Sequence, residues 1–372
     1  MLKIGITGQA GFVGTHLYNT LGLFPEEFER IDFQKEYFED PNQLNEFVAQ
    51  CDVIVHLAAM NRHNDPQVIY DTNIGLVEKL IQSLDQTKSK AHVLFSSSSQ
   101  EERDNLYGKS KKEGRELMMN WAEKAGGKFT GMIIPNVFGP FGHPNYNSVV
   151  ATFCHKLAHN ETPTIEEDGE LKLIYVGELV EAILSEIRKG KGHAELVIAH
   201  TSESKVSQLL SLLESYKEQY QDKGIIPSIN NTFELNLFNT FRCYMDIATH
   251  FPVKFVEHTD PRGSFVEIIR LGVGGQVSFS TTVPSITRGN HYHTRKIERF
   301  AVIKGKALIQ LRRIGTDEVL DFYLDGAEPA YVDMPIWYTH NIKNIGEEVL
   351  YTNFWINEFY DPNDPDTYFE NV

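Results

Sequence analysis

The stretch that decides the fold is residues 2–14, LKIGITGQAGFVG. Its first six residues form an apolar run typical of a buried strand, and three glycines at regular spacing separate this run from a helical pattern. A strand, a glycine turn and a helix N-terminus in this order let backbone N–H groups approach a pyrophosphate closely. A purely structural βα turn is the alternative explanation. The residues predicted to surround the phosphates are Gly8, Gly11, Phe12, Val13 and Gly14.

Strand and helix patterns alternate outward from this stretch. Strands separated by helices of this length form parallel βαβ units, so we expect an α/β Rossmann-type doubly wound parallel sheet. A further amphipathic helix is predicted over Val206–Tyr220, where apolar residues recur at helical spacing. The predicted strands are Leu2–Thr7, Phe28–Asp32, Asp52–Ala58, His92–Ser96 and Phe129–Pro135, and the predicted helices are Phe12–Leu21, Pro41–Gln50, Pro66–Leu84 and Tyr107–Ala125.

From about Phe255 the pattern changes to short strands separated by Gly, Pro and Asp turns. Such a pattern without long helices predicts an all-β sandwich or barrel of antiparallel strands. We expect a first domain over 1–247 and a second over 254–372, because 372 residues exceed the usual size of one core. The strands predicted in the second domain are Phe265–Arg270, Gln276–Val283, Glu298–Ile303, Ala307–Arg312 and Val349–Trp355.

Charge and cysteine usage exclude several classes of protein. The formal net charge of −16 opposes nucleic-acid binding, although local basic groups and helix N-termini can still hold an anionic nucleotide. Cys51, Cys154 and Cys243 are far apart and form no CxxC pair, so we expect free thiols. The sequence shows neither a signal-peptide pattern nor a long apolar run, so we expect a cytoplasmic protein without a membrane partner.

Several motifs in the first domain resemble those of the extended short-chain dehydrogenase/reductase family. They are the GxxGxxG turn, the DxxxHLAA run Asp52–Ala59, Asn73, the YxxxK run Tyr107–Lys111 after the serines 96–99, and the NVFGP turn Asn136–Pro140. The resemblance implies cofactor contacts from Leu57, Ala58, Ala59, Tyr107 and Lys111, and a substrate contact from Asn136.

The chemistry of that family fits these residues. Tyr107 and Lys111 share one face of a helix because they are four residues apart. Lys111 is expected to lower the pKa of the Tyr107 phenol and to hold the ribose hydroxyls. Tyr107 then protonates a carbonyl oxygen as hydride arrives from a nicotinamide, while Ser98 hydrogen-bonds that oxygen. Ser99-Gln100 replace the acidic pair of the family's dehydratases, which disfavours dehydration.

Asp32 bears on the choice of cofactor. It ends the second predicted strand, where a carboxylate usually accepts hydrogen bonds from the adenosine ribose and repels a 2′-phosphate. Taken alone, Asp32 favours NADH, and a strand-end cap is its other explanation. The relatives to which the resemblance points use NADPH. We therefore expect NADPH, with NADH as the alternative.

A group of histidines marks the second domain. His291 and His293 form an HxH pair, and Glu298 and His340 follow at a spacing that resembles the two cupin motifs. Alternation along a strand puts the HxH histidines on one face, and the resemblance places the other two on neighbouring strands. Three histidines and a carboxylate suit zinc or another borderline divalent ion. A metal-free histidine site is the alternative.

A second resemblance overlaps the first. Asp260–Glu267, DPRGSFVE, and Arg288–His291, RGNH, resemble elements of dTDP-4-dehydrorhamnose 3,5-epimerases. In those cupins the histidine of the second element removes a proton beside a ketone. His291 therefore has two possible roles, metal ligand and general base, and the sequence leaves both open.

The whole chain resembles a family of bifunctional capsular polysaccharide synthesis enzymes that join a reductase to a cupin epimerase. The resemblance implies that the cupin epimerises C3 of UDP-2-acetamido-2,6-dideoxy-L-arabino-4-hexulose, and that the first domain then reduces C4 to give UDP-2-acetamido-2,6-dideoxy-L-talose, for UDP-N-acetyl-L-fucosamine. A homodimer is expected by analogy. Matching stretches are His143–Val149, Ala151–Cys154, Tyr338–Ile342 and Pro362–Phe369.

Two other functions are compatible with these motifs. One is a sugar-nucleotide 4-ketoreductase whose cupin is structural or dimerising. The other is a dinucleotide sensor without enzymatic activity. Sensors on this fold commonly lose the catalytic Tyr or Lys, and this chain has both Tyr107 and Lys111.

Overall fold

The computed structural model describes residues 1–261 and 263–372. In this part of the chain no helix has both the length and the apolar character needed to cross a membrane. The chain forms two compact units, the first made of residues 1–152 and 167–206, the second of residues 153–166 and 207–372.

The first unit is built on a six-stranded sheet in which all strand pairs are parallel. The strand order β2-β1-β3-β4-β5-β8 means that the chain leaves β1 on one side for β2 and then crosses to β3 on the other. Open α/β sheets bind ligands beyond the carboxyl ends of the strands at such a reversal. The strands are β1 (Leu2–Thr7), β2 (Phe28–Ile31), β3 (Val53–His56), β4 (His92–Ser98), β5 (Lys128–Ile134) and β8 (His193–Val197).

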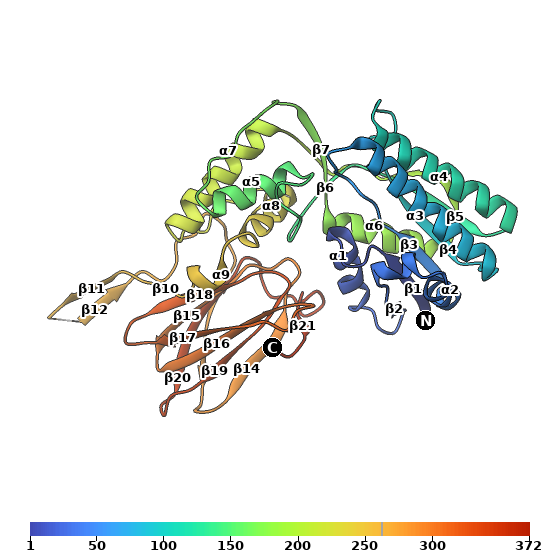
Figure 1. Ribbon diagram of the computed structural model, residues 1–372. Helices are drawn as coiled ribbons and strands as arrows, with labels where there is room; N and C mark the ends of the chain where they lie inside the picture. Colours follow the sequence, from blue (N-terminus) through green and yellow to red (C-terminus); the bar gives the residue numbers. More distant parts are fainter. Residues whose placement is uncertain (262) are drawn as a thin grey trace. The chain divides into compact units, whose positions relative to one another are not determined.

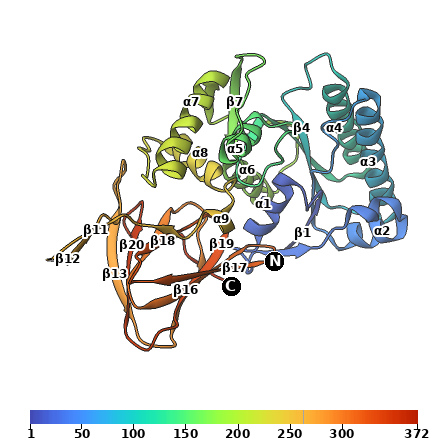
Figure 2. The ribbon, with the colours of Figure 1, turned by 60° about the vertical axis from the view of Figure 1, so that its left-hand side comes forward.

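Helices cover both faces of this sheet, as Figures 1 and 2 show. Within β3, Ile54 belongs to the core on one face, while Val53 and Val55 belong to the core on the other. This arrangement confirms the predicted doubly wound, Rossmann-type sheet. One face carries α2 (Pro41–Gln50), α3 (Pro66–Gln86) and α4 (Leu106–Ala125), and the other carries α1 (Phe12–Leu21) and α6 (Val176–Lys189).

Local signals define where these helices begin. The Asp40 carboxylate accepts hydrogen bonds from the amides of Asn42 and Gln43, and Pro41 takes the first helical position of α2. These signals explain why the predicted bounds of α2 are confirmed. The remaining elements are η1 (Lys35–Glu39), the small sheet of β6 (Asn136–Phe138), β7 (Glu170–Tyr175) and β9 (Ser202–Lys205), and α5 (Val149–Ala158), which runs from the first unit into the second.

The second unit contains two five-stranded antiparallel sheets that share one hydrophobic core. Val302 and Val332 come from one sheet, and Ile309 and Phe322 from the other. This confirms the predicted all-β, cupin-like second half. One sheet is β10 (Val253–Lys254), β18 (Ala330–Met334), β15 (Glu298–Lys304), β20 (Leu350–Ile356) and β13 (Gln276–Thr282), and the other is β17 (Val319–Asp325), β16 (Lys306–Arg313), β19 (Tyr338–Asn344), β14 (Thr287–Tyr292) and β21 (Tyr368–Phe369).

Helices also belong to the second unit, and a buried polar network joins them to its sheets. Arg299 of β15 donates two hydrogen bonds to Asp333 of β18, at 2.7 and 2.9 Å, and Tyr220 donates to the same carboxylate at 2.7 Å. Arg242 donates to the Tyr220 hydroxyl at 3.1 Å. Residues 207–247 therefore pack with the β-rich part, while the functional division at about residue 250 stays a prediction. The helical elements are α7 (Val206–Tyr216), η2 (Lys217–Asp222), α8 (Thr232–Arg242) and α9 (Ile247–His250).

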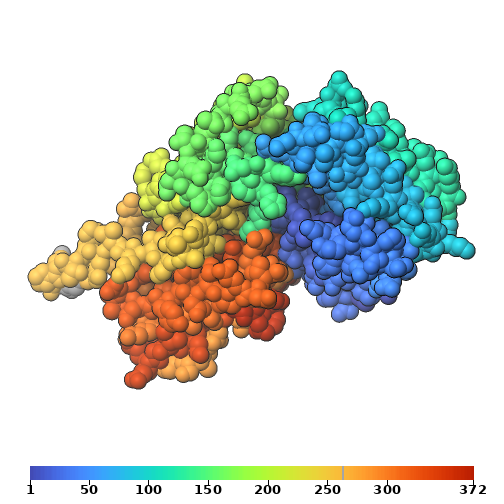
Figure 3. All heavy atoms as spheres, viewed as in Figure 1, coloured from blue at the N-terminus to red at the C-terminus, as the bar shows by residue number. Residues whose placement is uncertain are grey.

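An exposed hairpin of β11 (Glu257–Asp260) and β12 (Gly263–Val266) completes this unit. It protrudes at the left of Figure 3. The predicted strand Phe265–Arg270 was too long, because β12 ends at Val266 and Arg270 turns back to form an ion pair with Glu267. Arg262 of the DPRGSFVE run lies outside the described residues.

Candidate functional site

The glycine turn joins β1 to α1 at the carboxyl edge of the first sheet. Gly8 has a φ of +77°, and its carbonyl accepts the amide of Gly11 at 2.9 Å. A Cβ on Gly14 would lie 2.2 Å from the Gly8 carbonyl oxygen, so α1 can start this close to the turn only with glycine there. Phe12 and Val13 form the first turn of α1, for which the described chain provides no side-chain cap. Its amides are thus available to a pyrophosphate.

Other predicted cofactor residues surround this turn. Leu57–Ala59 follow β3, and a Cβ on Gly8 would lie only 2.8 Å from the Ala58 amide. Asp32 follows β2, is exposed, and accepts a 2.7 Å hydrogen bond from the Tyr18 hydroxyl. The structure thus gathers these residues at the carboxyl ends of β1, β2 and β3, where a dinucleotide would lie.

Asn73 of α3 ties this edge to α4. Its Oδ1 accepts the Met60 amide at 2.7 Å, and its Nδ2 donates to the Ser110 hydroxyl at 3.0 Å. The segment after β3 is therefore fixed to the helix that carries Tyr107 and Lys111.

Ser98 and Tyr107 are in contact. Ser98 ends β4 and hydrogen-bonds to the hydroxyl of Tyr107, which lies in the first turn of α4. Lys111, buried one turn further along, donates to the Ser96 hydroxyl at 3.4 Å, and its ammonium lies 4.9 Å from the centre of the Phe95 ring. The predicted serine and tyrosine thus form a pair, with the lysine beside the preceding residues of β4.

Burial dominates the titration of both groups. It raises the pKa of Tyr107, which the hydrogen bond with Ser98 partly offsets. It lowers the pKa of Lys111 to about 8, against the attraction of Glu101. Burial rather than Lys111 therefore controls the Tyr107 pKa, because the ammonium is directed toward β4. A tyrosine that keeps its proton at neutral pH can protonate a carbonyl oxygen.

The sequence analysis missed a buried ion pair behind this serine turn. Arg115 donates to Glu101 from Nε at 2.9 Å and from Nη2 at 2.8 Å, and Ser97 donates to the same carboxylate. Both charged side chains line a pocket of about 290 Å³ next to Ser98. The Glu101 carboxylate is thus bound by Arg115, which agrees with the expectation that this chain lacks the acidic pair of a dehydratase.

The predicted substrate turn lies near the same edge. Asn136 begins β6 and is exposed, and the turn is held by a 2.9 Å hydrogen bond between His16 Nε2 and the Pro140 carbonyl. Tyr146 lies close enough to Tyr107 to raise its pKa further. The sequence analysis named Tyr146 only within a matching stretch, without a role.

The four predicted metal-binding residues come together in the second unit. His291 lies in β14, His293 just after it, Glu298 at the start of β15 and His340 in β19. Their ligand atoms all lie within 4.8 Å of one another. Oε2 of Glu298 lies 3.1 Å from Nε2 of His293 and 3.1 Å from Nε2 of His340. His291 is the most accessible of the four, and the others are buried.

A β-bulge aims His291 at this cluster. The register between β14 and β19 shifts between Gly289 and His291, and His291 then pairs with His340. Gly289 has a φ of +101°, and a Cβ on it would lie 2.8 Å from the His340 carbonyl oxygen. The glycine of the RGNH run is therefore required by the backbone.

Glu298 and the histidines of the cluster shift one another's pKa values. Burial raises its pKa, but its contacts with His293 and His340 outweigh that effect and lower the pKa. Burial lowers the pKa of His291 to about 4, and repulsion from the other two histidines adds to this. Burial also opposes protonation of His293, yet its contact with Glu298 raises its pKa overall.

The cluster fits a borderline divalent metal ion. Nε2 of His340 is buried and has no hydrogen-bond partner within the described ranges, since its approach to Glu298 lacks hydrogen-bond geometry. A buried, unsatisfied nitrogen directed at a carboxylate oxygen is what a shared metal ion would satisfy. Three imidazoles and a carboxylate are also the donor types that zinc accepts.

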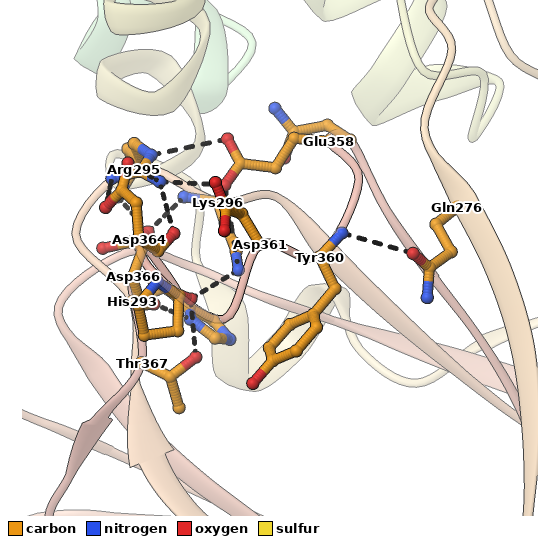
Figure 4. Close-up of polar contacts among 12 residues, drawn as sticks. Gln276, His293, Arg295, Lys296, Glu358, Tyr360, Asp361, Asp364, Asp366 and Thr367 are labelled. Carbon is orange, nitrogen blue, oxygen red and sulfur yellow. Dashed lines mark hydrogen bonds and ion pairs between the residues drawn. The ribbon is translucent and has the colours of Figure 1, made fainter.

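The C-terminal segment 358–371 contacts the chain next to His293 (Figure 4). The carbonyl oxygen of Asp366 accepts a hydrogen bond from Nδ1 of His293 at 2.5 Å. The Asp366 carboxylate accepts hydrogen bonds from the three backbone amides of residues 294–296, each at 3.0 Å. The sequence analysis included Asp366 only in a matching stretch. No local signal could reveal its contacts, because 73 positions separate it from His293.

Comparisons with known proteins cover both units. Residues 4–199 match the NAD dependent epimerase/dehydratase family, and residues 258–368 match the polysaccharide biosynthesis C-terminal domain. The Pseudomonas aeruginosa UDP-2-acetamido-2,6-beta-L-arabino-hexul-4-ose reductase is 32% identical over 99% of this chain and 98% of its own. The capsular polysaccharide assembling protein CapF from Staphylococcus aureus has a solved structure that is 35% identical, covers 100% of both chains and gives a TM-score of 0.63.

A more distant solved structure is similar in fold to part of this chain. RMD from Pseudomonas aeruginosa, complexed with NADPH, is 20% identical over 59% of this chain and 83% of its own, with a TM-score of 0.53. The chain belongs to the NAD dependent epimerase/dehydratase family, and it also carries the polysaccharide biosynthesis C-terminal domain.

Proposed function

We propose that this protein converts a UDP-linked 4-keto amino sugar in two steps, epimerisation at C3 and then reduction at C4. One observation carries the proposal: a single chain holds a Ser98–Tyr107 pair near a dinucleotide turn and an accessible His291 in a buried cluster of metal-binding type. The proposed substrate is UDP-2-acetamido-2,6-dideoxy-L-arabino-4-hexulose, and the product is UDP-2-acetamido-2,6-dideoxy-L-talose. The name of the Pseudomonas aeruginosa reductase supports this substrate class, and the pathway would be UDP-N-acetyl-L-fucosamine synthesis for a capsular or surface polysaccharide.

Reduction at C4 uses the first unit. A nicotinamide dinucleotide bound at the glycine turn supplies the hydride. Tyr107 gives its proton to the C4 oxygen, and Ser98, already hydrogen-bonded to Tyr107, orients that oxygen. Lys111, one turn further along α4, would hold the ribose hydroxyls of the dinucleotide, the role that its place in the YxxxK run implies. Asp32, which follows β2, would contact the adenosine ribose; we propose NADPH, with NADH as the alternative.

Epimerisation at C3 uses the histidine cluster. His291 is the group that we assign to removing the C3 proton, because it is more accessible than the other three. His293, Glu298 and His340, with or without His291, would hold a divalent ion, for which we propose zinc. Such an ion, when bound, polarises the C4 carbonyl and so makes the neighbouring C–H more acidic.

The chemistry fixes the order of the two steps. The C3–H is acidic only while C4 is a ketone, because the negative charge left at C3 spreads onto the C4 oxygen. Reduction converts that ketone to an alcohol and ends the acidity. Epimerisation must therefore come first.

Deuterium labelling tests the proposal directly. The protein is given the 4-keto UDP-sugar in deuterated water without nicotinamide, with NADPH, or with NADH, and the products are followed by NMR. We expect deuterium at C3 in all three samples and a C4 alcohol only where a reduced dinucleotide is present. Reduction without exchange at C3 would indicate a plain ketoreductase, and the absence of both reactions would favour a dinucleotide sensor.

His291→Ala separates the two roles of His291. Loss of the base should reduce C3 exchange by a factor of about 10²–10⁴ and leave reduction of an already epimerised ketone unchanged. Metal content, measured on the same samples, shows whether His291 is also a ligand. His63→Ala, which changes an exposed histidine of the first unit, is the control. Unchanged C3 exchange in His291→Ala would refute the base assignment.

We also propose that the protein forms a homodimer through the hairpin β11–β12 and the edge strand β13. Val277 and Phe279 of β13 are 55% and 71% exposed, and Phe265 of β12 is 67% exposed. An apolar edge strand of this kind pairs readily with a second chain. Light scattering should give about twice 42.4 kDa, and Phe279→Asp should shift the mass to that of one chain. Tyr323→Asp, on the other sheet's edge, should leave the dimer intact; a monomeric wild-type protein would exclude the proposal.

A further inference from the structure

The C-terminal segment 358–371, called the strap below, lies against the strand that carries His291. Its strand β21 pairs with β14 and brings Phe369 opposite His291 and Tyr368 opposite Tyr292. The rings of Tyr368 and Tyr292 stack with 5.4 Å between centroids and 30° between planes. The strap therefore supplies the edge strand of the sheet on which the cluster is built.

Asp366 is the most heavily bonded residue of the strap. Besides the three amides of residues 294–296, its carboxylate accepts the Thr294 hydroxyl at 2.7 Å. Asp366 is 2% exposed and has a φ of +39°, a backbone conformation that a non-glycine residue adopts only when its surroundings enforce it. The four hydrogen bonds to the buried Asp366 carboxylate stabilise this backbone conformation. They also hold the segment between His293 and Glu298 in one conformation.

The same residue also determines which nitrogen of His293 faces the cluster. A carbonyl oxygen only accepts hydrogen bonds, so Nδ1 of His293 must carry the proton that it donates to Asp366. Nε2 is then the nitrogen that can offer a lone pair, and it lies 3.1 Å from Oε2 of Glu298. Metal-binding histidines are generally oriented by such a partner on their other ring nitrogen.

Ionic contacts hold the strap in place from outside. Arg295 binds Asp364 at 2.9 Å and Glu358 at 3.1 Å, and Lys296 donates to the Pro365 carbonyl at 2.5 Å (Figure 4). Residues that precede Asp366 in the strap are thus bound to the segment that follows His293. The strap and this segment form one unit in which Asp366 is the buried centre.

We propose that Asp366 is a positioning residue of the metal centre, which orients His293 through its carbonyl and fixes residues 294–296 through its carboxylate. This inference rests on the proposed function to the extent that the cluster binds a divalent ion. Asp366 does not touch the ion or the sugar. Its contribution is to hold His293 and Glu298 at the separation that an ion requires, so that little rearrangement is needed on binding.

Zinc affinity of the full-length protein tests this role. Asp366→Ala keeps the carbonyl bond to His293 but removes all four bonds of the carboxylate, and it should weaken zinc binding about 10- to 100-fold in competition with a chromophoric chelator. Asp361→Ala is the matched control, because in the described part of the chain the Asp361 carboxylate accepts hydrogen bonds only from Asn363, which also lies in the strap. Thr294→Val removes a single hydrogen bond and should weaken binding about two- to tenfold.

Two further measurements separate positioning from loss of folding. The absorption spectrum of the cobalt-loaded protein reports ligand geometry, and it should change in Asp366→Ala and remain as in wild type in Asp361→Ala. In the metal-free protein, amides 294–296 should exchange with deuterium faster in Asp366→Ala. If Asp366→Ala does not fold, Thr294→Val decides the question.

The outcomes distinguish this inference from the function on which it rests. Equal zinc affinity and equal cobalt spectra in Asp366→Ala and Asp361→Ala, with zinc bound by wild type, would overturn the positioning role alone. A wild-type protein that binds no divalent ion would overturn both the metal centre and the role of Asp366 in it.

Discussion

Replacing Tyr107 by Phe should lower kcat for reduction of the C4 ketone by a factor of about 10²–10⁴. The substitution keeps the ring and removes only the hydroxyl that is hydrogen-bonded to Ser98. Burial raises the pKa of this hydroxyl, so at neutral pH it is the protonated group needed at the carbonyl oxygen. Oxidation of NADPH by the 4-keto UDP-sugar, followed at saturating concentrations of both, measures the loss.

Two comparisons make this result specific. Tyr70→Phe removes a surface hydroxyl that donates to Glu113, and it should leave reduction unchanged. Deuterium exchange at C3 should also survive in Tyr107→Phe, because the cluster around His291 belongs to the other unit. Full reductase activity in Tyr107→Phe would contradict its assignment as the proton donor.

Replacing Asp333 by Asn should destabilise the second unit by about 3–5 kcal/mol. Asp333 is fully buried, accepts two hydrogen bonds from Arg299 and accepts a third from Tyr220. The amide keeps the shape but not the charge, so the buried guanidinium of Arg299 loses its counter-ion in a region where water cannot compensate for the loss. Urea unfolding followed by fluorescence or circular dichroism measures the change.

The control for Asp333→Asn is an isosteric change in an exposed ion pair. Glu348 lies 3.3 Å from Lys304 with both side chains 59% exposed, so Glu348→Gln should change the free energy of unfolding by less than about 1 kcal/mol. Equal effects of the two variants would show that the buried network is held by packing rather than by its charges.

Local signals made much of the fold predictable. Gly8, Gly11 and Gly14 between a strand and a helix predict the first βα unit, and the Asp40–Pro41 pair marks the start of α2. The error at Phe265–Arg270 arose because apolar residues continue past Val266, at Ile268 and Ile269, whereas the chain ends its pairing at Val266. Interactions between distant parts of the chain gave no such signal, as the 113 positions between Tyr220 and Asp333 illustrate.

In the candidate sites, too, local patterns were predictable and contacts between distant residues were not. His291, His293, Glu298 and His340 could be predicted as a group because their spacing is specific, and the structure brings them together. Their catalytic and metal-binding roles stay predictions. The contacts that support the sites had no sequence signal, since Asp366 is joined to residues near His293 only by the folding of the strap.

The buried network around Asp333 also limits how the gene could be divided or recombined. A cut near codon 250, where the sequence character changes, would leave Tyr220 and Arg242 on one fragment and their partners Asp333 and Met334 on the other. Each fragment would then expose polar groups that are made to be buried together. An exchange of this β-rich domain between related genes should therefore succeed only when residues 207–247 are transferred with it, so that the inherited module is larger than the domain itself.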